Sequence, residues 1–376
     1  MLERVVLKGF KAAADLSVRL EPLTLLTGLN SSGKSTVLQS IALLRQSFFG
    51  RGDRAITLHG SIVQLGTFGE ILSEGRQADS IELEVRCDSQ ISRIVFSADS
   101  GSSYAPAVVM EGDWSCITKD DFQFLHADRI SPQSLFPRSS EAAQAAGVLG
   151  ARGEYTAEFL ATASVAEFEV PQGRRATRAP GVSVDLSRKI APTSGLLEQT
   201  AAWMQHLSPG VRLTSDLLAG TDSARILFEY VGRTGVLETD KKIRPGNVGF
   251  GLTYSLPIVV SCLIAPPGSL LLVENPEAHL HPQGQAAMGE LLAKVAADGV
   301  QLVIETHSDH VLNAIRLAVK KGVISSDLIA IHYFTRDIET GFSVVESPAM
   351  LEDGRLSSWP SGFFDQWDMA LDELLR

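Results

Sequence analysis

The residues with the clearest chemical meaning form one short run near the start of the chain. Residues 28–35 read Gly-Leu-Asn-Ser-Ser-Gly-Lys-Ser, which matches the phosphate-binding pattern Gly-x-x-x-x-Gly-Lys-Ser/Thr. The glycines permit a tight loop whose backbone N–H groups point at phosphate oxygens, and the start of the following helix adds positive potential. In such a loop Lys34 neutralises the β- and γ-phosphates and Ser35 ligates Mg²⁺. The run therefore predicts a site for a nucleoside triphosphate with Mg²⁺.

Two later segments follow apolar strands and carry side chains suited to phosphate chemistry. The apolar run 270–273 leads into Glu274, and the strand expected over 301–305 leads into His307. In open α/β sheets, ligands bind at the carboxyl ends of the strands. We therefore expect Glu274 to serve Mg²⁺ and the attacking water, and His307 to reach the γ-phosphate.

A glycine-rich turn lies upstream of Glu274. Residues 246–253 read Gly-Asn-Val-Gly-Phe-Gly-Leu-Thr and open an expected helix. Such a turn can offer N–H groups and a helix dipole to a phosphate. Because residues 28–35 already hold one triphosphate, the natural client of the second site is ATP held by another copy of the chain, which predicts a head-to-head dimer. A plain packing turn between two elements is the alternative.

The elements that must position these motifs alternate between strands and helices. Apolar runs predict strands over 4–7, 16–20 and 23–26 and then a helix from Lys34, whereas short alternating segments from 56 to 124 predict antiparallel strands. Further helices are expected over 154–168, 196–207, 252–263, 283–297 and 309–320. The predicted fold class is α/β, without a long coiled coil. Three segments are expected: an N-terminal lobe (1–125) with the phosphate loop and antiparallel strands, a mainly helical insertion (126–243), and a C-terminal lobe (244–376).

Composition narrows the class of protein further. The 376 residues are 44% hydrophobic and 20% charged, as in ordinary globular proteins. No uncharged apolar run reaches about 18 residues and the N-terminus is charged, so we expect a cytoplasmic protein without a membrane span. The three cysteines are widely spaced and odd in number, which indicates neither a disulfide framework nor a cysteine-based zinc site.

The charge pattern leaves nucleic-acid binding open. A net charge of -11 argues against a wholly basic nucleic-acid-coating protein but permits a local basic face. The densest basic stretches are interpreted as solvated surface; they are Arg174, Arg175 and Arg178, then Arg188 and Lys189, then Lys241, Lys242 and Arg244.

Taken together, the motifs resemble those of ABC-type ATPases of the RecF, SMC and OLD-like kind. The resemblance is to the stand-alone bacterial AAA-family ATPases that are associated with anti-phage defence. TGLNSSGKST resembles their Walker A motif, VENPEAHLHP their Walker B motif and D-loop, NVGFGL their signature turn, and ETHSDHVLNAIR their His switch. VQLGTFGEIL resembles the Q-loop, and FQFLHADRISP, ARGEYTAEFL and WPSGFFDQ also resemble segments of the group, so the resemblance spans nearly the whole chain.

This resemblance implies a role for each matching residue. Nucleotide contacts fall in one copy to Phe10, Lys11, Gly28, Asn30, Ser31, Ser32, Gly33, Lys34, Ser35 and Thr36, and in the other copy to Asn247, Gly249 and Gly251. The implied Mg²⁺ ligands are Ser35, Gln64 and Glu274, and the implied catalytic residues are Glu274, Asn275, Glu277 and His307.

The chain departs from the family pattern at Asn275. Most ABC-type ATPases keep a carboxylate there to take a proton from water, and an amide cannot act as a general base. We therefore expect turnover well below the typical enzyme value of roughly 10 per second, unless Glu277 takes over. The charged groups at 128–129 and 152–154 are interpreted as buried ion pairs, with nucleotide sensing as the alternative.

Three functions remain open at this level. The first is an ATP-driven sensor or regulator that dimerises on ATP and controls a separate effector, a nuclease or toxin, in phage defence. The segment after His307 is too short for a Toprim nuclease and contains no Asp-x-Asp pair, so the effector is expected on another chain. The second is a nearly hydrolysis-dead, ATP-dependent scaffold. The third is a RecF-like ATPase of DNA maintenance, which predicts salt-dependent duplex binding.

Overall fold

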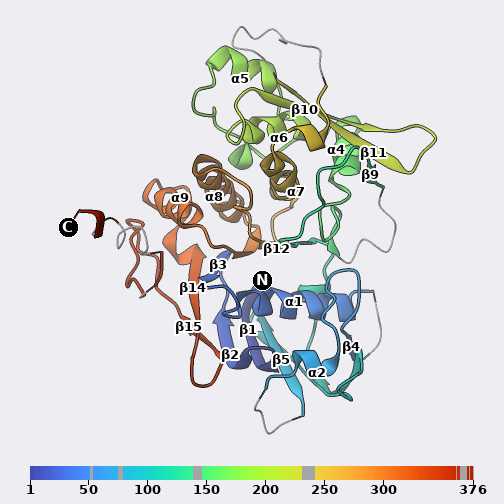
Figure 1. The fold of residues 1–376 in the computed structure, drawn as a ribbon, viewed down its shortest axis with the longest axis vertical. Helices are drawn as coiled ribbons and strands as arrows, with labels where there is room; N and C mark the ends of the chain where they lie inside the picture. The colour runs from blue at the N-terminus through green and yellow to red at the C-terminus, as the bar shows by residue number, and fades with distance from the viewer. Residues whose placement is uncertain are drawn as a thin grey trace. The chain divides into compact units, whose positions relative to one another are not determined.

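The computed structural model describes residues 1–50, 54–74, 79–138, 146–230, 242–360, 362–364, 371 and 373–375. Lys241 and part of the WPSGFFDQ tail lie outside the described residues. The chain forms two compact units, residues 1–118 with 303–376 and residues 119–302 (Figure 1). These units begin and end at other residues than the three predicted segments.

An antiparallel sheet forms much of the first unit. Its strand order is β2-β1-β5-β6-β7-β4. The strands are β1 (Leu2–Phe10), β2 (Ala13–Arg19), β4 (Ala55–Thr57), β5 (Ile81–Cys87), β6 (Gln90–Phe96) and β7 (Tyr104–Glu111). In β5 buried residues alternate with more exposed ones, as expected for a sheet that covers a core with one face. The antiparallel strands predicted between 56 and 124 are confirmed for β4 to β7.

A second group of strands in the first unit carries the phosphate-binding motif. β3 (Leu23–Gly28) pairs in parallel with β14 (Ile329–Arg336), and β15 (Ser343–Glu346) extends the sheet beyond β14. On the other side β3 neighbours β13 (Gln301–Glu305). Residues 23–27 are all buried, which is typical of a parallel strand covered on both faces.

Helices follow the strands of this second group. α1 (Lys34–Phe48) follows β3, and α9 (Asp309–Lys320) follows β13. α1 contacts β1, and Figure 1 shows the two elements side by side. The helix predicted over 309–320 is confirmed at both ends. Ser308 caps its first turn by accepting a hydrogen bond from the N–H of Val311. The remaining helical turns of the unit are α2 (Phe68–Ile71), α3 (Ser115–Thr118) and η4 (Ser326–Leu328).

The second unit is built around helices. α6 (Leu196–Met204) packs against α7 (Phe250–Ile264), which in turn contacts α8 (Pro282–Ala297), and Figure 1 shows the three together. β8 (Phe122–Leu125) pairs in parallel with β12 (Leu270–Glu274). The other helical elements are α4 (Thr156–Val165), η2 (Gln172–Arg174), α5 (Val184–Ile190) and η3 (Pro245–Asn247).

The segment 126–243 also contains an antiparallel sheet that the sequence analysis did not predict. The strand order is β10-β11-β9, with β9 (Phe136–Pro137), β10 (Val211–Leu217) and β11 (Ser223–Tyr230). The run Thr214-Ser215-Asp216 in β10 is only half-buried, so the alternation of apolar residues fades before the strand ends. When a strand is stabilised mainly by pairing with its neighbour, the alternation of apolar residues in its sequence is weak.

Arg174 corrects one interpretation of the basic stretches. It was expected on the solvated surface, but its side chain is fully buried and its Nε donates to Asp298 Oδ2 at 2.6 Å. Its Nη1 donates to the carbonyl oxygens of Cys262 and Ala265 at the end of α7, whereas Nη2 is buried without a hydrogen-bond partner among the described residues. The ion pair and the two carbonyl contacts compensate most of the cost of burying the guanidinium.

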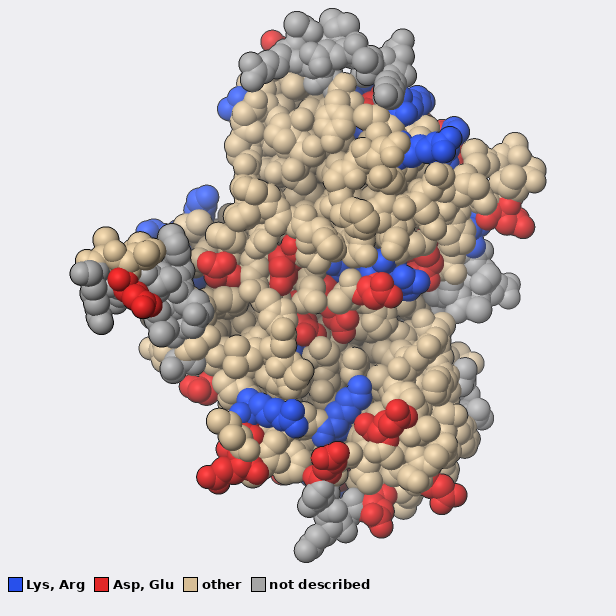
Figure 2. All heavy atoms as spheres, in the orientation of Figure 1, with Lys and Arg blue, Asp and Glu red and all other residues tan. Residues whose placement is uncertain are grey.

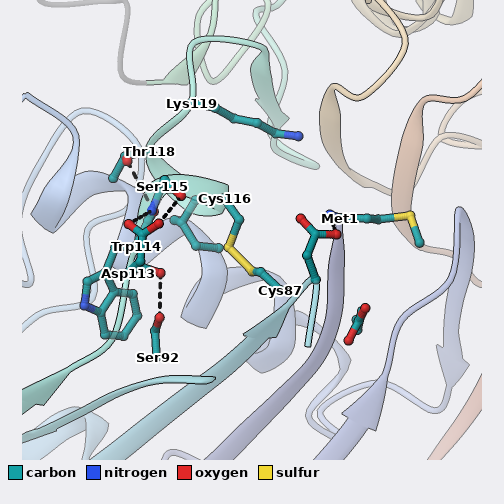
Figure 3. The surroundings of a disulfide bond; sticks show 12 residues. Met1, Cys87, Ser92, Asp113, Trp114, Ser115, Cys116, Thr118 and Lys119 are labelled. Atoms are coloured by element: carbon teal, nitrogen blue, oxygen red, sulfur yellow. Dashed lines mark hydrogen bonds and ion pairs between the residues drawn. A yellow bond between two sulfur atoms is a disulfide. The ribbon is translucent and has the colours of Figure 1, made fainter. Parts of the chain in front are cut away.

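The cysteines correct a second expectation. Cys87 at the end of β5 and Cys116 in α3 form a disulfide with their Cα atoms 6.4 Å apart (Figure 3). The pair is 29 residues apart in the sequence, and only the folded chain brings the strand end to the helix. Cys262 is free and buried, and burial raises the pKa of its thiol to about 12.

Charged side chains on the face drawn in Figure 2 lie in small groups of both signs. No continuous basic surface is visible on that face. Among the described residues, no helix is both long enough and apolar enough to cross a bilayer.

Candidate functional site

The loop between β3 and α1 has the backbone that its glycines predict. Gly28, Ser31 and Gly33 have φ values of +136°, +61° and +100°. A Cβ atom on Gly28 would lie 2.1 Å from Phe334 O, and one on Gly33 would lie 2.1 Å from Ser343 Oγ. β14 and β15 thus form a floor so close to the loop that only glycine fits at these two positions.

The backbone of this loop offers hydrogen-bond donors to a ligand. Within the described part of the chain, the amide N–H groups of residues 30–33 donate to no other backbone carbonyl. The loop is held from behind, because Ser32 Oγ donates to Leu29 O at 2.8 Å and Ser343 Oγ donates to Ser32 O at 2.7 Å. α1 begins at Lys34 without a side-chain cap, so its positive end adds to the potential in the loop. This donor set fits a polyphosphate.

Lys34 and Ser35 meet a carboxylate that the sequence analysis did not select. Lys34 is 3% exposed, and its Nζ donates to Leu29 O at 2.6 Å and to Gly28 O at 3.1 Å. Ser35 Oγ donates to Glu305 Oε1 at 3.0 Å, and that oxygen is also 3.9 Å from Lys34 Nζ. Glu305 is the last residue of β13, which lies beside β3, so its position at the end of a buried strand was the signal that could have identified it.

His307 lies with the loop, as predicted from its place after β13. The N–H of Thr306 donates to Leu26 O at 3.0 Å, which fixes the chain just before the histidine. The exposed His307 lines an open cavity of about 380 Å³. The other residues around the cavity are Thr27, Gly28, Leu29, Asn30, Asp309, Tyr333, Gly362 and Phe364.

The remaining candidates of the first unit lie in three different environments. Thr36 is buried in the first turn of α1 and its N–H donates to Gly33 O. Phe10 is fully buried, and Lys11 has a φ of +53° and donates to Gln39 Oε1 of α1 at 2.7 Å. Gln64 is exposed in the segment before α2 and forms an isolated backbone bridge with His59.

Glu274 lies at the end of β12 in the second unit. Its carboxylate is buried, and Oε2 accepts a hydrogen bond from the N–H of Ala127 at 2.9 Å and lies 3.7 Å from His126 Nδ1. In the described structure, Oε1 is buried without a hydrogen-bond partner. Because a buried carboxylate oxygen needs a compensating partner, this oxygen fits a divalent cation or a cation-bound water.

Arg129 holds the backbone around Glu274. Its two terminal nitrogens donate to Glu274 O at 2.8 Å and to Asn275 O at 2.7 Å. The side chain is 1% exposed, and burial lowers the pKa of the guanidinium to about 10 against the opposing effect of Glu277 and Glu274. The expected buried pair with Asp128 is therefore wrong.

Asp128 instead pairs with Arg152 at 3.2 Å, where both side chains are half or more exposed. The buried guanidinium of Arg129 donates to backbone carbonyls instead. Such contacts cannot be predicted from a sequence, because every residue has a backbone carbonyl.

Asn275 has a φ of +44°, a conformation that asparagine adopts more readily than most residues. Its Oδ1 is buried with no hydrogen-bond partner among the described residues. Glu277 follows in a short turn, in which the N–H of Ala278 donates to Asn275 O and that of Leu280 to Glu277 O.

The glycine-rich turn meets the segment after Glu274 within the second unit. Asn247 ends η3, Gly249 precedes α7, and a Cβ atom on Gly251 would lie 2.6 Å from His279 O. Phe250 is 53% exposed, and its ring lies 5.8 Å from the His279 ring. A Cβ atom on Gly249 would meet no atom within 4 Å, so this part of the turn is open to an incoming group.

The loop, the strand order around it and the turn before α7 define a P-loop ATPase fold of the ABC type. A family model described as "AAA domain, putative AbiEii toxin, Type IV TA system" matches residues 23–313, and the chain belongs to this family. A second model, described as "Protein of unknown function (DUF3696)", matches residues 324–374. No match was found among curated proteins.

Solved structures of SMC heads share the fold. A crystal structure of an SMC head bound to the C-winged helix domain of ScpA is 14% identical, with 93% of this chain and 98% of that chain covered and a TM-score of 0.51. An Smc head domain with an extended coiled coil, bound to the C-terminal domain of ScpA derived from Pyrococcus furiosus, is 13% identical, with 100% of both chains covered and a TM-score of 0.51. At this identity the likeness concerns the fold.

Proposed function

We propose that this protein binds ATP with Mg²⁺, dimerises through an ATP sandwich, hydrolyses the nucleotide slowly, and thereby regulates a separate nuclease or toxin in bacterial anti-phage defence in the cytoplasm. The observation that carries the proposal is the loop of residues 28–35, in which the N–H groups of residues 30–33 donate to no backbone carbonyl among the described residues and Lys34 is buried. Membership in a family described as a putative toxin of a type IV toxin–antitoxin system supports the link to an effector.

In this proposal each group of residues has one task. The loop N–H groups, Lys34 and Thr36 hold the phosphates, and Phe10 and Lys11 lie near the nucleotide. Ser35, Gln64 and Glu274 hold Mg²⁺, which polarises the phosphates when bound. His307 contacts the γ-phosphate from its side of the cavity. Asn247, Gly249 and Gly251 of a second copy close over the same phosphates.

Slow hydrolysis follows from the residue after Glu274. Asn275 occupies the position at which most ABC-type ATPases have the carboxylate that takes a proton from the attacking water, and an amide cannot accept that proton. Glu277 is the next carboxylate along the chain after Asn275, and its negative charge acts on the buried Arg129. A long-lived ATP-bound dimer suits a regulator, because the signal then lasts as long as the nucleotide remains intact.

The test measures nucleotide binding together with particle mass. Wild type, Lys34→Ala and the control Lys320→Ala, which removes an exposed lysine at the end of α9 in the same unit, are compared by calorimetry and by light scattering. We expect wild type and the control to bind ATP-Mg²⁺ and double their mass, and Lys34→Ala to do neither. Wild type that remains monomeric with bound ATP would contradict the sandwich.

The same samples separate the competing functions. A regulator hydrolyses ATP slowly and its dimer then dissociates, whereas a scaffold stays assembled with no phosphate release. A RecF-like ATPase binds duplex DNA in the presence of ATP, with an affinity that falls steeply as salt rises.

A further inference from the structure

Glu305 occupies a position at the phosphate loop for which the family resemblance supplies no role. It ends β13, is 5% exposed, and accepts the hydroxyl hydrogen of Ser35 at 3.0 Å. Ser35 is the loop residue whose oxygen ligates Mg²⁺ in nucleotide sites of this kind. The contact therefore joins a buried carboxylate to the proposed metal ligand within one unit of the chain.

The chemistry of a serine ligand explains why such a carboxylate is useful. A serine hydroxyl coordinates a cation through an oxygen lone pair and keeps its hydrogen, which needs an acceptor in a buried site. An anionic acceptor fixes the direction of the O–H bond, aims the lone pair away from it, and makes the oxygen a better donor to the metal. Glu305 Oε1 is that acceptor.

The charges around Glu305 lead to the same conclusion. Lys34 Nζ lies 3.9 Å from Glu305 Oε1, and both side chains are buried. If Lys34 turns to the phosphates, part of the compensation for the carboxylate is lost, and a buried carboxylate without a cation is costly. A divalent cation bound at Ser35 compensates the negative charge of Glu305 in its place.

We propose that Glu305 is a positioning residue for the divalent cation, orienting Ser35 and compensating the charge of the bound metal. It supplies a carboxylate from β13, whereas the Walker B segment of this chain carries Glu274-Asn275 in place of the common acidic pair. The inference rests on the proposed function, since it needs a nucleotide-bound Mg²⁺. It predicts that Glu305 sets the affinity for the metal and not the affinity for the nucleotide itself.

The experiment measures binding of the β,γ-imido analogue of ATP by calorimetry, first in EDTA and then across a series of free Mg²⁺ concentrations. The variants are Glu305→Gln, Glu305→Asp and, as a matched control, Glu346→Gln, which removes an exposed carboxylate from β15 of the same unit. We expect the Mg²⁺ concentration for half-maximal tightening to rise by about 10- to 100-fold in Glu305→Gln. Glu305→Asp should fall between this value and wild type, and the control should match wild type.

The EDTA measurements distinguish this inference from the proposed function. Glu305→Gln should bind the analogue in EDTA at least as tightly as wild type, because a negative charge has been removed beside the phosphates. An unchanged Mg²⁺ midpoint would overturn the inference, and so would loss of binding in EDTA, which marks Glu305 as structural. Wild type that binds the analogue without any Mg²⁺ effect also overturns it but leaves nucleotide binding intact. Wild type that binds nothing in either condition removes both proposals.

Discussion

Arg129 is the residue on which the backbone around Glu274 depends most directly. It donates to the carbonyl oxygens of Glu274 and Asn275 from a side chain that is 1% exposed. Arg129→Lys keeps the charge but cannot span two carbonyls with a planar fork. We expect a loss of about 1.5–3 kcal/mol in the free energy of unfolding, measured by chemical denaturation.

The control for this change is Arg152→Lys, in the exposed pair with Asp128, which should lose less than about 1 kcal/mol. Equal losses of unfolding free energy in the two variants would show that the carbonyl contacts of Arg129 stabilise the protein no more than an exposed ion pair does.

Asn275 provides a direct test of slow hydrolysis. Asn275→Asp restores a carboxylate, and aspartate tolerates the φ of +44° at this position nearly as well as asparagine. We expect phosphate release under single-turnover conditions to accelerate by about 10-fold or more, since a positioned base contributes at least that much. ATP affinity should not change. An unchanged rate in Asn275→Asp, combined with a loss of rate in Glu277→Gln, would assign the base to Glu277.

His332 makes stability depend on pH. Its ring is buried between Ser347 Oγ and Arg19 O, and burial lowers its pKa, although the bond to Arg19 O raises it. Below the ordinary histidine pKa of about 6.5 the unfolded chain takes up a proton that the folded chain resists, so stability falls as pH drops through this range. His332→Gln should flatten that fall in denaturation curves, whereas the exposed His59→Gln should not.

At the scale of elements, the strands and helices around the phosphate loop were predictable because their residues follow simple rules. Residues 23–27 form a short, leucine-rich buried segment that ends at Gly28, and residues 309–320 follow a serine cap. The sheet of β10 and β11 escaped prediction because its half-buried polar residues carry no period. Contacts to backbone carbonyls, such as those of Arg174, are invisible in a sequence for the same reason.

The loop residues were likewise predictable as candidates, but the partner of Ser35 was not. Glu305 directly precedes Thr306-His307, and nothing in the sequence distinguishes its carboxylate from other acidic residues at strand ends. Glu305 reaches Ser35 because β13 lies beside β3, and this strand order cannot be read from the sequence.

The disulfide between β5 and α3 is a stabilising link at the scale of elements. A bridge between cysteines 29 positions apart lowers the entropy of the unfolded chain, which stabilises the folded state by about 3.5 kcal/mol. We expect the melting temperature of wild type to fall on reduction and that of Cys87→Ala to be low under both conditions. Cys262→Ala, which removes the free thiol, should keep the full response to reductant. A wild-type melting temperature indifferent to reductant would contradict a stabilising role.

At the scale of the whole molecule, the exposed aromatic ring at the turn before α7 bears on assembly. Phe250 is 53% exposed beside His279 and Tyr254, and exposed aromatic residues of this kind often dominate an interface. Phe250→Ala should weaken ATP-dependent dimerisation by about 2 kcal/mol or more, measured by analytical ultracentrifugation, without changing ATP affinity at low protein concentration. Val165→Ala, at an 86% exposed position of the same unit, should leave dimerisation unchanged.

The floor beneath the phosphate loop comes from residues more than 300 positions later in the chain, Phe334 and Ser343. During synthesis the ribosome delivers Gly28 and Lys34 long before it delivers that floor. A nascent chain therefore contains the whole Walker A sequence before it contains the residues that shape the loop. A product truncated before β14 lacks the floor of the phosphate loop. The phosphate loop can take its folded shape only after β14 and β15 have been synthesised.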